Sequence, residues 1–499
     1  MSKKKKTIDD MLQEASVSEE DQYYKIPENW TWVRMGEIVN INPTKPKIEL
    51  PDEHLCSFLS MSNVNPQTGS IDELEERRFD KVKKGYTYFK EHDVLFAKIT
   101  PCMENGNTVI ANGLRNQFGY GSTEFYVLRT PKQVDERYIY FLLRSEKFRK
   151  QAKAVMSGAV GQQRVPKKFL ETYPLALPPL NEQKRIVEKV DYLFKKIEEA
   201  KQLVEETKET FELRRASILD KAFRGELSAQ WREDNLVVED AFSILERIRT
   251  KKINSSIKSN TLKINSVTKD EEPFDLPNGW AWIRLGEISY YVTSGSRDWS
   301  KYYSNEGAMF VRTQDINKNS LNLNDVAFVS LPEKVEGKRS LVEKSDILTT
   351  ITGANVGKCA LVEADIKEAY VSQSVALTKL IEKSIAKYVH LSLLSPCGGG
   401  KELEIRAYGI GRPVLSLEDI KNIKIPLAPI GEQQFIVDMV EKLLANEKES
   451  MRLASVEKQL EILKQSILNK AFCGELGTND LNDESSLGVL KEILQEKIK

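Results

Sequence analysis

The sequence has few of the residues on which catalytic and metal sites depend. Its 499 residues include three histidines, His54, His92 and His390, and none lies in a His-Glu-x-x-His spacing. Its five cysteines are scattered and form no Cys-x-x-Cys pair, a pattern typical of a reducing cytosol rather than of a disulfide framework or a zinc site. We therefore expect a cytoplasmic chain with no catalytic residues and no metal ligands.

The sequence also lacks long apolar runs and an excess of charge. No run is long enough to cross a membrane, and the Lys-rich start has no apolar core that would make it a secretory signal. Lys plus Arg and Asp plus Glu number 74 each, so the formal net charge is zero. A domain that coats nucleic acid nonspecifically is usually basic. This balance argues mildly against DNA binding, although local basic patches escape the argument.

Motifs for nucleotide binding and methyl transfer are incomplete. The segment Gly353-Ala-Asn-Val-Gly-Lys-Cys359 has three residues between its glycines, where a phosphate-binding loop has four. A cysteine follows its lysine, where that loop needs a hydroxyl for magnesium. We expect a turn between two strands there. Because the chain has neither a glycine-rich S-adenosylmethionine loop nor an Asn/Asp-Pro-Pro-Tyr-type motif, we expect no methylation by this chain unaided.

The chain contains the same frame twice. Residues 26–38 return at 276–288, a shift of 276 − 26 = 250 positions, and residues 175–183 return at 425–433 with the same shift. Residues 217–227 return at 466–476, a shift of 466 − 217 = 249. A period this long is far beyond that of solenoids or propellers. It indicates two copies of a domain followed by a tail.

The segments between these anchors differ between the copies. Residues from about 40 to 158 and from about 290 to 408 hardly match, and both read as short strands with turns followed by a short helix, at 138–143 and 388–394. Two like frames with unlike inserts favour one scaffold that presents two different reading surfaces.

Long helices are predicted after the second anchor of each copy. Apolar residues alternate at spacings of four and three from Ile186 to Phe211, which is the seam of a coiled coil. Forty-odd residues at about 1.5 Å each make a rod of about 65 Å. The second rod begins after Gly431, and its frame slips near Asn446. We expect the two rods to pair antiparallel, although rods from two chains could pair instead.

Each predicted rod ends in Ala-Phe-x-Gly-Glu-Leu, with the glycine at a helix C-cap position. Short amphipathic segments follow at 241–248 and 487–494, and a related piece lies at 7–12. These segments suit either capping helices or partner docking. Residues 249–269 are rich in Lys, Asn and Ser, and we expect a flexible basic linker.

These motifs resemble those of type I restriction–modification specificity subunits. The resemblance rests on the paired Pro-x-x-Trp-x-Trp-x-Arg-x-Gly-Glu-Ile openings, on Pro-x-x-Glu-Gln at 179–183 and 429–433, and on residues 93–106 and 221–231. It covers nearly the whole chain, in order, twice. The second copy departs from the first, because Cys473 stands where the first has Arg224 and no Ala-Gln-Trp follows Leu476. The two tails are therefore expected to dock their partners unequally.

The resemblance implies an α+β chain in which two globular α/β target-recognition domains are joined and spaced by two long antiparallel coiled-coil helices, with pseudo-twofold internal duplication. The expected parts are an N-terminal helical arm (1–22), target recognition domain 1 (23–180), spacer helix 1 (181–227), a short helix with a basic linker (228–275), target recognition domain 2 (276–430), spacer helix 2 (431–476) and a C-terminal helical tail (477–499).

The implied function is non-catalytic. Each domain would read one half of a bipartite, asymmetric site in double-stranded DNA. Two adenine-methyltransferase subunits, and through them restriction subunits, would dock on the chain, while S-adenosylmethionine, ATP and magnesium would belong to those partners. The alternative is a coiled-coil scaffold with two protein-binding globules, which the neutral charge and the long seams support.

Bases are read by Arg, Lys, Asn and Gln side chains at groove edges. The candidates for DNA contact are Lys98, Asn105, Gln162, Gln163, Arg164, Arg297, Arg312, Tyr408 and Arg412. The candidates for subunit docking lie in the two tails and are Phe223, Gly225, Glu226, Leu227, Phe472, Gly474, Glu475 and Leu476.

Overall fold

The computed structural model describes residues 7–159, 161–235, 239–254, 264–317, 319–332, 337–409, 411, 413–445 and 448–498, the side chains of 300 and 448–454 excepted. The chain divides into two compact units: unit 1 comprises Met1–Glu205 and Ala454–Lys499, and unit 2 comprises Glu206–Leu453. The C-terminal end of the second repeat therefore belongs to the unit that holds most of the first. No helix within the described ranges is long and apolar enough to cross a membrane.

Two four-stranded sheets form the body of unit 1. The antiparallel sheet has the order β2 (Asn40–Ile41), β9 (Phe125–Arg129), β6 (Val94–Ala97) and β7 (Thr108–Ile110). The other has the order β4 (Glu75–Arg78), β3 (Leu55–Leu59), β8 (Phe118–Gly121) and β5 (Thr87–Lys90), and β3 runs parallel to β8. All four side chains of β6 are buried, as expected for a short apolar run inside a sheet.

Unit 1 also contains a two-stranded ribbon, which lies next to its helices. Strand β1 (Thr31–Arg34), from the first anchor, pairs antiparallel with β10 (Pro174–Leu177), from the second. The predicted helix at 138–143 lies within α5 (Glu136–Arg144), which packs its apolar face into the core. The other short helices are α1 (Ile8–Ala15), α2 (Met35–Ile38), α3 (Phe79–Val82), α4 (Cys102–Asn105), α6 (Glu146–Ala154), α7 (Lys167–Thr172) and α17 (Ser486–Ile498).

Unit 2 repeats the order of the first sheet and the parallel pair of the second, whose fourth strand lies at the opposite edge from that of unit 1. Its sheets have the orders β12 (Ser289–Ser294), β21 (Val375–Leu380), β18 (Ile347–Thr350), β19 (Cys359–Leu361) and β13 (Tyr303–Ser304), β17 (Ala327–Val329), β14 (Ala308–Val311), β20 (Ala369–Val371). Here β14 runs parallel to β20, as β3 does to β8. Strand β11 (Ala281–Arg284) pairs with β22 (Lys424–Leu427), and a small hairpin joins β15 (Ile316–Asn317) to β16 (Ser320–Leu321).

The helices of unit 2 follow the first copy only in part, since the described residues hold no counterpart of α3 or α4. They are α9 (Ala229–Asp234), α10 (Ala241–Asn254), α11 (Leu285–Ile288), α12 (Ala386–Leu394), α13 (Gly400–Ile405), α14 (Leu417–Lys421) and α15 (Ile430–Leu444). Helix α12 contains the predicted helix at 388–394. The basic linker predicted at 249–269 is wrong at its start, because α10 continues to Asn254. Lysine and arginine are good helix formers, and here they extend a helix whose Ile244, Leu245 and Ile248 are buried.

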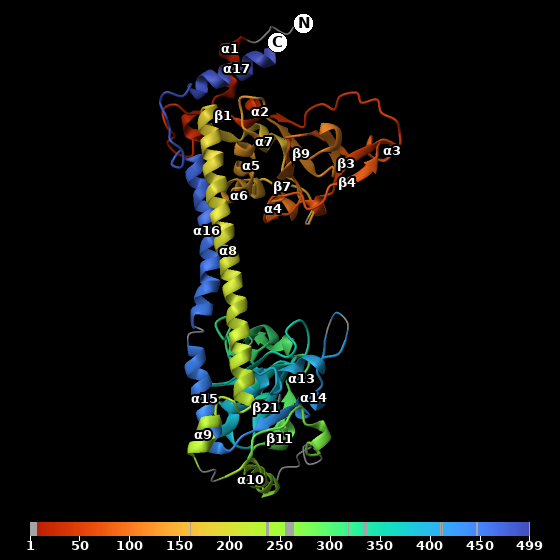
Figure 1. Cartoon of the computed structure of the whole chain (residues 1–499). Coiled ribbons are helices and arrows are strands. Elements are labelled where there is room, and N and C mark those ends of the chain that lie inside the picture. The colour runs from red at the N-terminus through yellow and green to blue at the C-terminus, as the bar shows by residue number, and fades with distance from the viewer. Residues whose placement is uncertain are drawn as a thin grey trace. The chain divides into compact units, whose positions relative to one another are not determined.

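One long helix, α8 (Leu180–Phe223), joins the two units, and α16 (Lys448–Phe472) forms the second rod. Within unit 1, α8 and α16 run side by side and antiparallel (Figure 1), because Glu198 pairs with Lys464 and Lys201 with Glu461. The predicted antiparallel pairing is therefore confirmed there. The second rod is divided into α15 and α16, and the predicted frame slip at Asn446 falls outside the described residues.

Candidate nucleic-acid interface

The repeated motifs meet at a buried junction in each unit. In unit 2, the carboxylate of Glu432, from Pro-x-x-Glu-Gln, is fully buried at the start of α15. It accepts hydrogen bonds from Trp280 Nε1 at 2.8 Å and from Ser228 Oγ at 2.6 Å, and it pairs with Arg232. Trp280 comes from the opening motif, and Ser228 and Arg232 come from the segment after α8. Two recurring sequence motifs and the segment that follows the first tail thus meet at one structural site.

Unit 1 has the same junction with different partners. Glu182 is fully buried and accepts hydrogen bonds from Thr478 Oγ1 and from the Asn479 backbone N–H, both at 2.9 Å. Arg185 also pairs with it. In each unit the start of one long helix is therefore tied to the segment that follows the other rod.

The glycine of each tail lies against the proline of an opening motif. Gly225 has φ +76° and a Cβ built on it would lie 2.5 Å from Pro277 Cγ; Gly474 also has φ +76°, with Pro27 Cγ at 2.5 Å. The rings of Phe223 and Phe472 are buried 5.2 Å from those of Tyr388 and Tyr138. These four tail residues pack inside their own units, and nothing here tests the docking role predicted for them. The neighbouring tail residues Glu226, Leu227, Glu475 and Leu476 are exposed or half-buried, and their docking role stays a prediction.

The second tail has Cys473 where the first has Arg224, and Lys147 compensates for this difference within unit 1. The guanidinium of Arg224 lies 4.5 Å from the ring centroid of Phe274. In unit 1, where Cys473 replaces that arginine, Lys147 Nζ lies 4.6 Å from the ring of Tyr24. Lys147 stands 250 positions before Cys397, so the cation and the cysteine have exchanged places between the copies. The cation–aromatic contact is kept.

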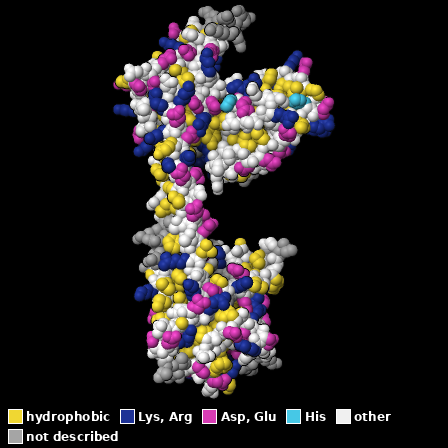
Figure 2. Space-filling view, in the orientation of Figure 1, with side chains coloured by type: hydrophobic (Ala, Val, Ile, Leu, Met, Phe, Trp, Pro, Cys, Tyr) yellow, Lys and Arg dark blue, Asp and Glu magenta, His cyan; other side chains and the backbone are white. Residues whose placement is uncertain are grey.

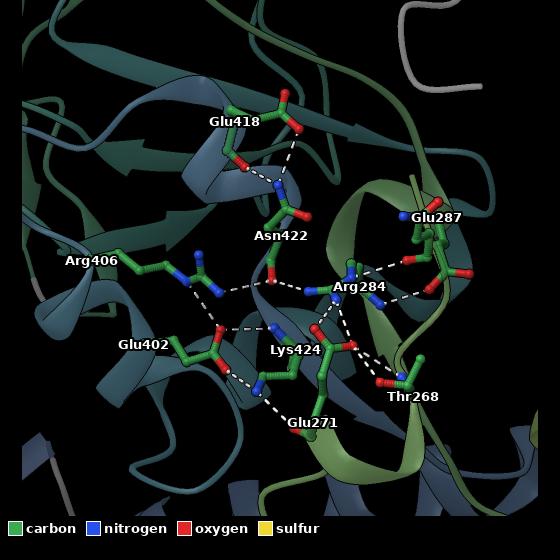
Figure 3. A network of polar contacts seen from close by, with 10 residues as sticks. Thr268, Glu271, Arg284, Glu287, Glu402, Arg406, Glu418, Asn422 and Lys424 are labelled. Carbon is green, nitrogen blue, oxygen red and sulfur yellow. Dashed lines mark hydrogen bonds and ion pairs between the residues drawn. The ribbon is translucent and has the colours of Figure 1, made fainter. Parts of the chain in front are cut away.

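The arginine of the second opening motif holds a polar network (Figure 3). Arg284 Nη2 donates to both oxygens of Glu271, at 2.6 and 2.8 Å. The Thr268 backbone N–H, followed by Arg284, lowers the pKa of Glu271 to about 2. Glu402 bridges Arg406 and Lys424, at 3.2 and 3.3 Å. This network ties the chain before β11 to the turn between α14 and β22, which is a structural role.

The loop at residues 157–164 brings together four of the predicted DNA-contact residues. Ser157 and Arg164 form a mutual backbone pair at 3.1 and 2.9 Å, and Val165 N donates to Lys98 O at 2.9 Å. Gln163 O accepts from Thr100 N at 3.0 Å, and Gln162 is exposed. Asn105 is exposed at the end of α4, outside this loop.

A carboxylate that we did not predict lies at the centre of this cluster. Glu124 accepts hydrogen bonds from Arg164 Nε at 2.9 Å and Nη2 at 2.8 Å, and its backbone O accepts from Lys98 N at 2.9 Å. The bonds from Arg164, and then the charge of Lys98, lower the pKa of Glu124. The sequence does not single out Glu124, although Ser122 and Ser372, 250 positions apart, begin equivalent turns in which the N–H three residues later donates to the serine O.

The ends of the 408–414 loop of unit 2, whose residues 410 and 412 lie outside the described part of the chain, pair in the same way. Tyr408 and Val414 form the mutual pair at 3.1 and 2.8 Å, and Leu415 N donates to Ile351 O at 2.9 Å. Ile351 N donates to Ser374 O at 2.9 Å, as Lys98 N does to Glu124 O. Ile351, Ser374 and Val414 therefore occupy the places of Lys98, Glu124 and Arg164. Tyr408 is 60% exposed, and Arg412 lies outside the described residues.

The two remaining candidates of unit 2 lie in different settings. Arg297 is exposed and lines a cavity of about 770 Å³ together with Arg339, Thr352, Gln373 and Ser374. That cavity adjoins the base of the 408–414 loop, so Arg297 is suitably placed for a ligand there. Arg312 is held by Asp315, at 3.1 Å, and by the carbonyl O of Asp325, at 2.9 Å. These contacts hold Arg312 against the helical turn at Thr313–Asp315, and its DNA-contact role stays a prediction.

Charges of both signs are interspersed over the face shown in Figure 2. Any nucleic acid contact on this face is therefore local rather than a broad basic track. Among the described residues, no group of three or more His, Cys, Asp or Glu side chains could hold a metal ion.

The fold and these sites define a protein built from two copies of one α+β domain that differ at their exposed loops. Residues 27–208 and 277–458 match the type I restriction modification DNA specificity domain. The chain belongs to this family and is a specificity subunit of a type I restriction–modification system.

Similar proteins of known class support this assignment. The chain is 30% identical over 482 residues to the specificity subunit of the type I restriction enzyme EcoEI of Escherichia coli, covering 85% of this chain and 79% of that protein. It is 27% identical over 487 residues to the EcoAI subunit of the same organism, covering 86% and 80%. A solved structure from a study of complex assembly and conformational transition of the type I R-M system matches with a TM-score of 0.61. That match is 22% identical and covers 91% of this chain and 100% of the other, which shows a shared fold.

Proposed function

We propose that each unit of this chain reads one part of a bipartite, asymmetric target in double-stranded DNA. The observation that carries the proposal is the pair of loops at 157–164 and 408–414, which share a backbone frame and differ in side chains. Base identity is read by side chains that a fixed backbone presents to a groove. Two frames with different side chains would select two different half-sites, so the target would not be palindromic.

The separation of the two half-sites would be set by the helical spacer. Half-site spacing follows from the element that joins two readers. Helix α8 is continuous from Leu180 to Phe223, and its seam residues Ile186, Val190 and Ile197 are buried. Removing one heptad from each rod is expected to shorten the preferred spacer of the target. An unchanged spacer would exclude the rods from this role.

The chain would act without chemistry of its own. In this proposal it docks two adenine-methyltransferase subunits, and through them restriction subunits, by surfaces that include Glu226, Leu227, Glu475 and Leu476. S-adenosylmethionine, ATP and magnesium would be bound by those partners. The chain would determine the DNA sequence at which they act.

The proposal is tested by co-expressing the chain with its modification subunit and mapping N6-methyladenine across the host genome at single-base resolution. We expect methylation within one split, asymmetric motif. A stable complex that adds no methylation would overturn the proposal and favour the alternative, a coiled-coil scaffold with two protein-binding globules.

Salt dependence separates these two alternatives directly. DNA binding weakens steeply as salt rises because counterions are released from the phosphates. The affinity of the complex for a duplex carrying the mapped motif is therefore expected to fall steeply between 50 and 200 mM salt, by an amount of about tenfold or more. An affinity that does not change with salt would contradict a DNA-reading role.

A further inference from the structure

Arg164 is held in one orientation before any ligand binds. Its Nε and Nη2 donate to the two carboxylate oxygens of Glu124 at 2.9 and 2.8 Å. Its Nη1 donates to the carbonyl O of Gln162 at 3.2 Å. The backbone on both sides is fixed, because Arg164 pairs with Ser157, and Glu124 O accepts from Lys98 N. Little conformational entropy would therefore be lost when this guanidinium met a ligand.

Glu124 takes the guanidinium edge formed by Nε and Nη2, and each terminal nitrogen keeps a donor beyond that edge. Arginine has five N–H donors. The three contacts above, among the described residues, use one on Nε, one on Nη1 and one on Nη2, which leaves one donor on each terminal nitrogen. The side chain is 45% exposed, so a ligand can reach these donors.

Two neighbouring donors on an arginine match one base in particular. Guanine presents O6 and N7, both acceptors, side by side in the major groove, and arginine pairs with them through two hydrogen bonds. Adenine has a donor in the place of O6, so the same arginine discriminates against it. Lys98 Nζ is turned away to the carbonyl O of Thr123, at 2.7 Å, and does not compete for the base.

Unit 2 has no such device at the equivalent position. Ser374 stands in the place of Glu124 and Val414 in the place of Arg164. Neither can present two charged donors. We therefore expect any difference between the two half-sites at this position to follow from the replacement of Glu124 by Ser374 and of Arg164 by Val414.

We propose that Arg164 reads a guanine in the half-site bound by unit 1, with Glu124 as the residue that positions it. This inference rests on the proposed function. Glu124 remains ionised beside the DNA because Arg164 and Lys98 compensate its charge, so the cluster keeps a net positive charge toward the phosphates.

The test removes the N7 acceptor from the guanine and, separately, the guanidinium donors of Arg164 from the protein. The complex of the full chain with its modification subunit is titrated with a duplex carrying the mapped motif, and with duplexes in which single guanines are replaced by 7-deazaguanine, which lacks N7. We expect one such replacement to weaken binding by about 5-fold or more. Arg164→Gln is expected to weaken binding to the unmodified duplex to a similar degree and to be insensitive to that replacement.

Matched variants test the positioning role and the choice of unit. Glu124→Gln is expected to reduce the sensitivity to the same guanine without abolishing it. Tyr408→Ala is expected to change selectivity only in the other half-site. Arg115→Ala removes an exposed arginine that pairs with Glu76 at 2.6 Å in the same unit, and it should leave the sensitivity unchanged.

The outcomes separate this inference from the proposed function. If the wild-type complex binds no split motif, the proposed function fails and the inference fails with it. If the wild-type complex binds its split motif, but Arg164→Gln stays sensitive to every replacement as the wild type is, only the inference is overturned. A half-site without guanine would also overturn it.

Discussion

Lys147 Nζ lies 4.6 Å from the ring centroid of Tyr24 in unit 1. The equivalent ring of unit 2, Phe274, is covered from the opposite partner, by Arg224 of the helix tail. Of the two equivalent positions, unit 1 has its cation at Lys147 and a cysteine at Cys473, whereas unit 2 has a cysteine at Cys397 and its cation at Arg224. The exchange preserves one cation–aromatic contact to the ring that precedes each opening motif, and it can be reversed by mutation.

Reversing this exchange should reveal a coupling between the two positions. Cys473→Arg alone places a second cation beside Lys147, in the cavity that both residues line with Tyr23 and Tyr24. Lys147→Cys alone removes the cation–aromatic contact. Each single variant is expected to destabilise unit 1, and the double variant should recover about 1 kcal/mol of their summed loss. Urea unfolding of the four proteins measures this coupling, and strictly additive losses would contradict it.

Gly474 is expected to tolerate no side chain. Gly474→Ala combines a positive φ with a Cβ 2.5 Å from Pro27 Cγ and Cδ, so it must displace the opening motif of unit 1. The matched control is Gly85→Ala, since Gly85 also has a positive φ, +81°, but no atom within 4 Å of the added Cβ. We expect Gly474→Ala to cost at least about 1 kcal/mol more than the control, whose loss reports backbone strain alone. Similar unfolding temperatures for the two variants would show that Pro27 moves away from the added Cβ without a cost in stability.

Arg232 is expected to be essential for the stability of unit 2 although it is partly exposed. Arg232→Ala leaves the fully buried carboxylate of Glu432 without its cation, and breaking one partner of such a pair costs about 3–5 kcal/mol. Arg232→Ala with Glu432→Gln should recover part of the loss, because the second change removes the uncompensated charge. The exposed pair Arg115–Glu76 supplies the control, for which Arg115→Ala should cost less than about 1 kcal/mol. Thermal unfolding compares the three, and equal losses at both arginines would refute a buried-charge effect.

The repeat predicted much of the fold because the anchors are local motifs. The short strands of the inserts, the long helix α8 and the C-cap glycines Gly225 and Gly474 each follow from short stretches of sequence. The residues that these motifs contact do not follow from the local sequence. Ser228 and Glu432 are 204 positions apart, and Thr478 and Glu182 are 296 apart, so only the folded chain shows that each tail completes the other copy's junction.

The predicted DNA-contact residues illustrate the same limit. Lys98, Gln162, Gln163 and Arg164 converge because the backbone of the 157–164 loop pairs with that of Lys98 and Thr100. Residue type alone did not distinguish Arg164, which keeps one donor on each terminal nitrogen, from Arg312, whose Nε and Nη2 donors are taken by Asp315 and the backbone O of Asp325. Nor did it indicate Glu124, whose position depends on a turn 40 residues away from Arg164.

His390 should make the stability of unit 2 depend on pH in the weakly acidic range. Its imidazole is buried in α12, where burial, and to a smaller extent the charges of Arg215 and Lys387, lower its pKa to about 4. The backbone O of Cys359, 3.4 Å from Nε2, opposes this shift without cancelling it. In the unfolded chain the imidazole recovers an ordinary pKa of about 6.5. Between these two values the unfolded chain binds a proton that the folded chain does not bind.

Stability must therefore fall as the pH falls from about 6.5 to about 4, and the contribution of His390 over that window is about 3 kcal/mol. Carboxylates such as Glu382, whose pKa Arg247 lowers to about 2, add their own loss below about pH 5, so the wild type alone does not isolate the histidine. His390→Gln provides the comparison, because glutamine does not titrate and its amide can still approach Cys359. Urea unfolding of both proteins at pH 7 and pH 4.5 should show the wild type losing about 2–3 kcal/mol more than the variant. Parallel losses would mean that the folded chain protonates His390 as readily as the unfolded chain does, which its burial among Arg215, Lys387 and the core of unit 2 argues against.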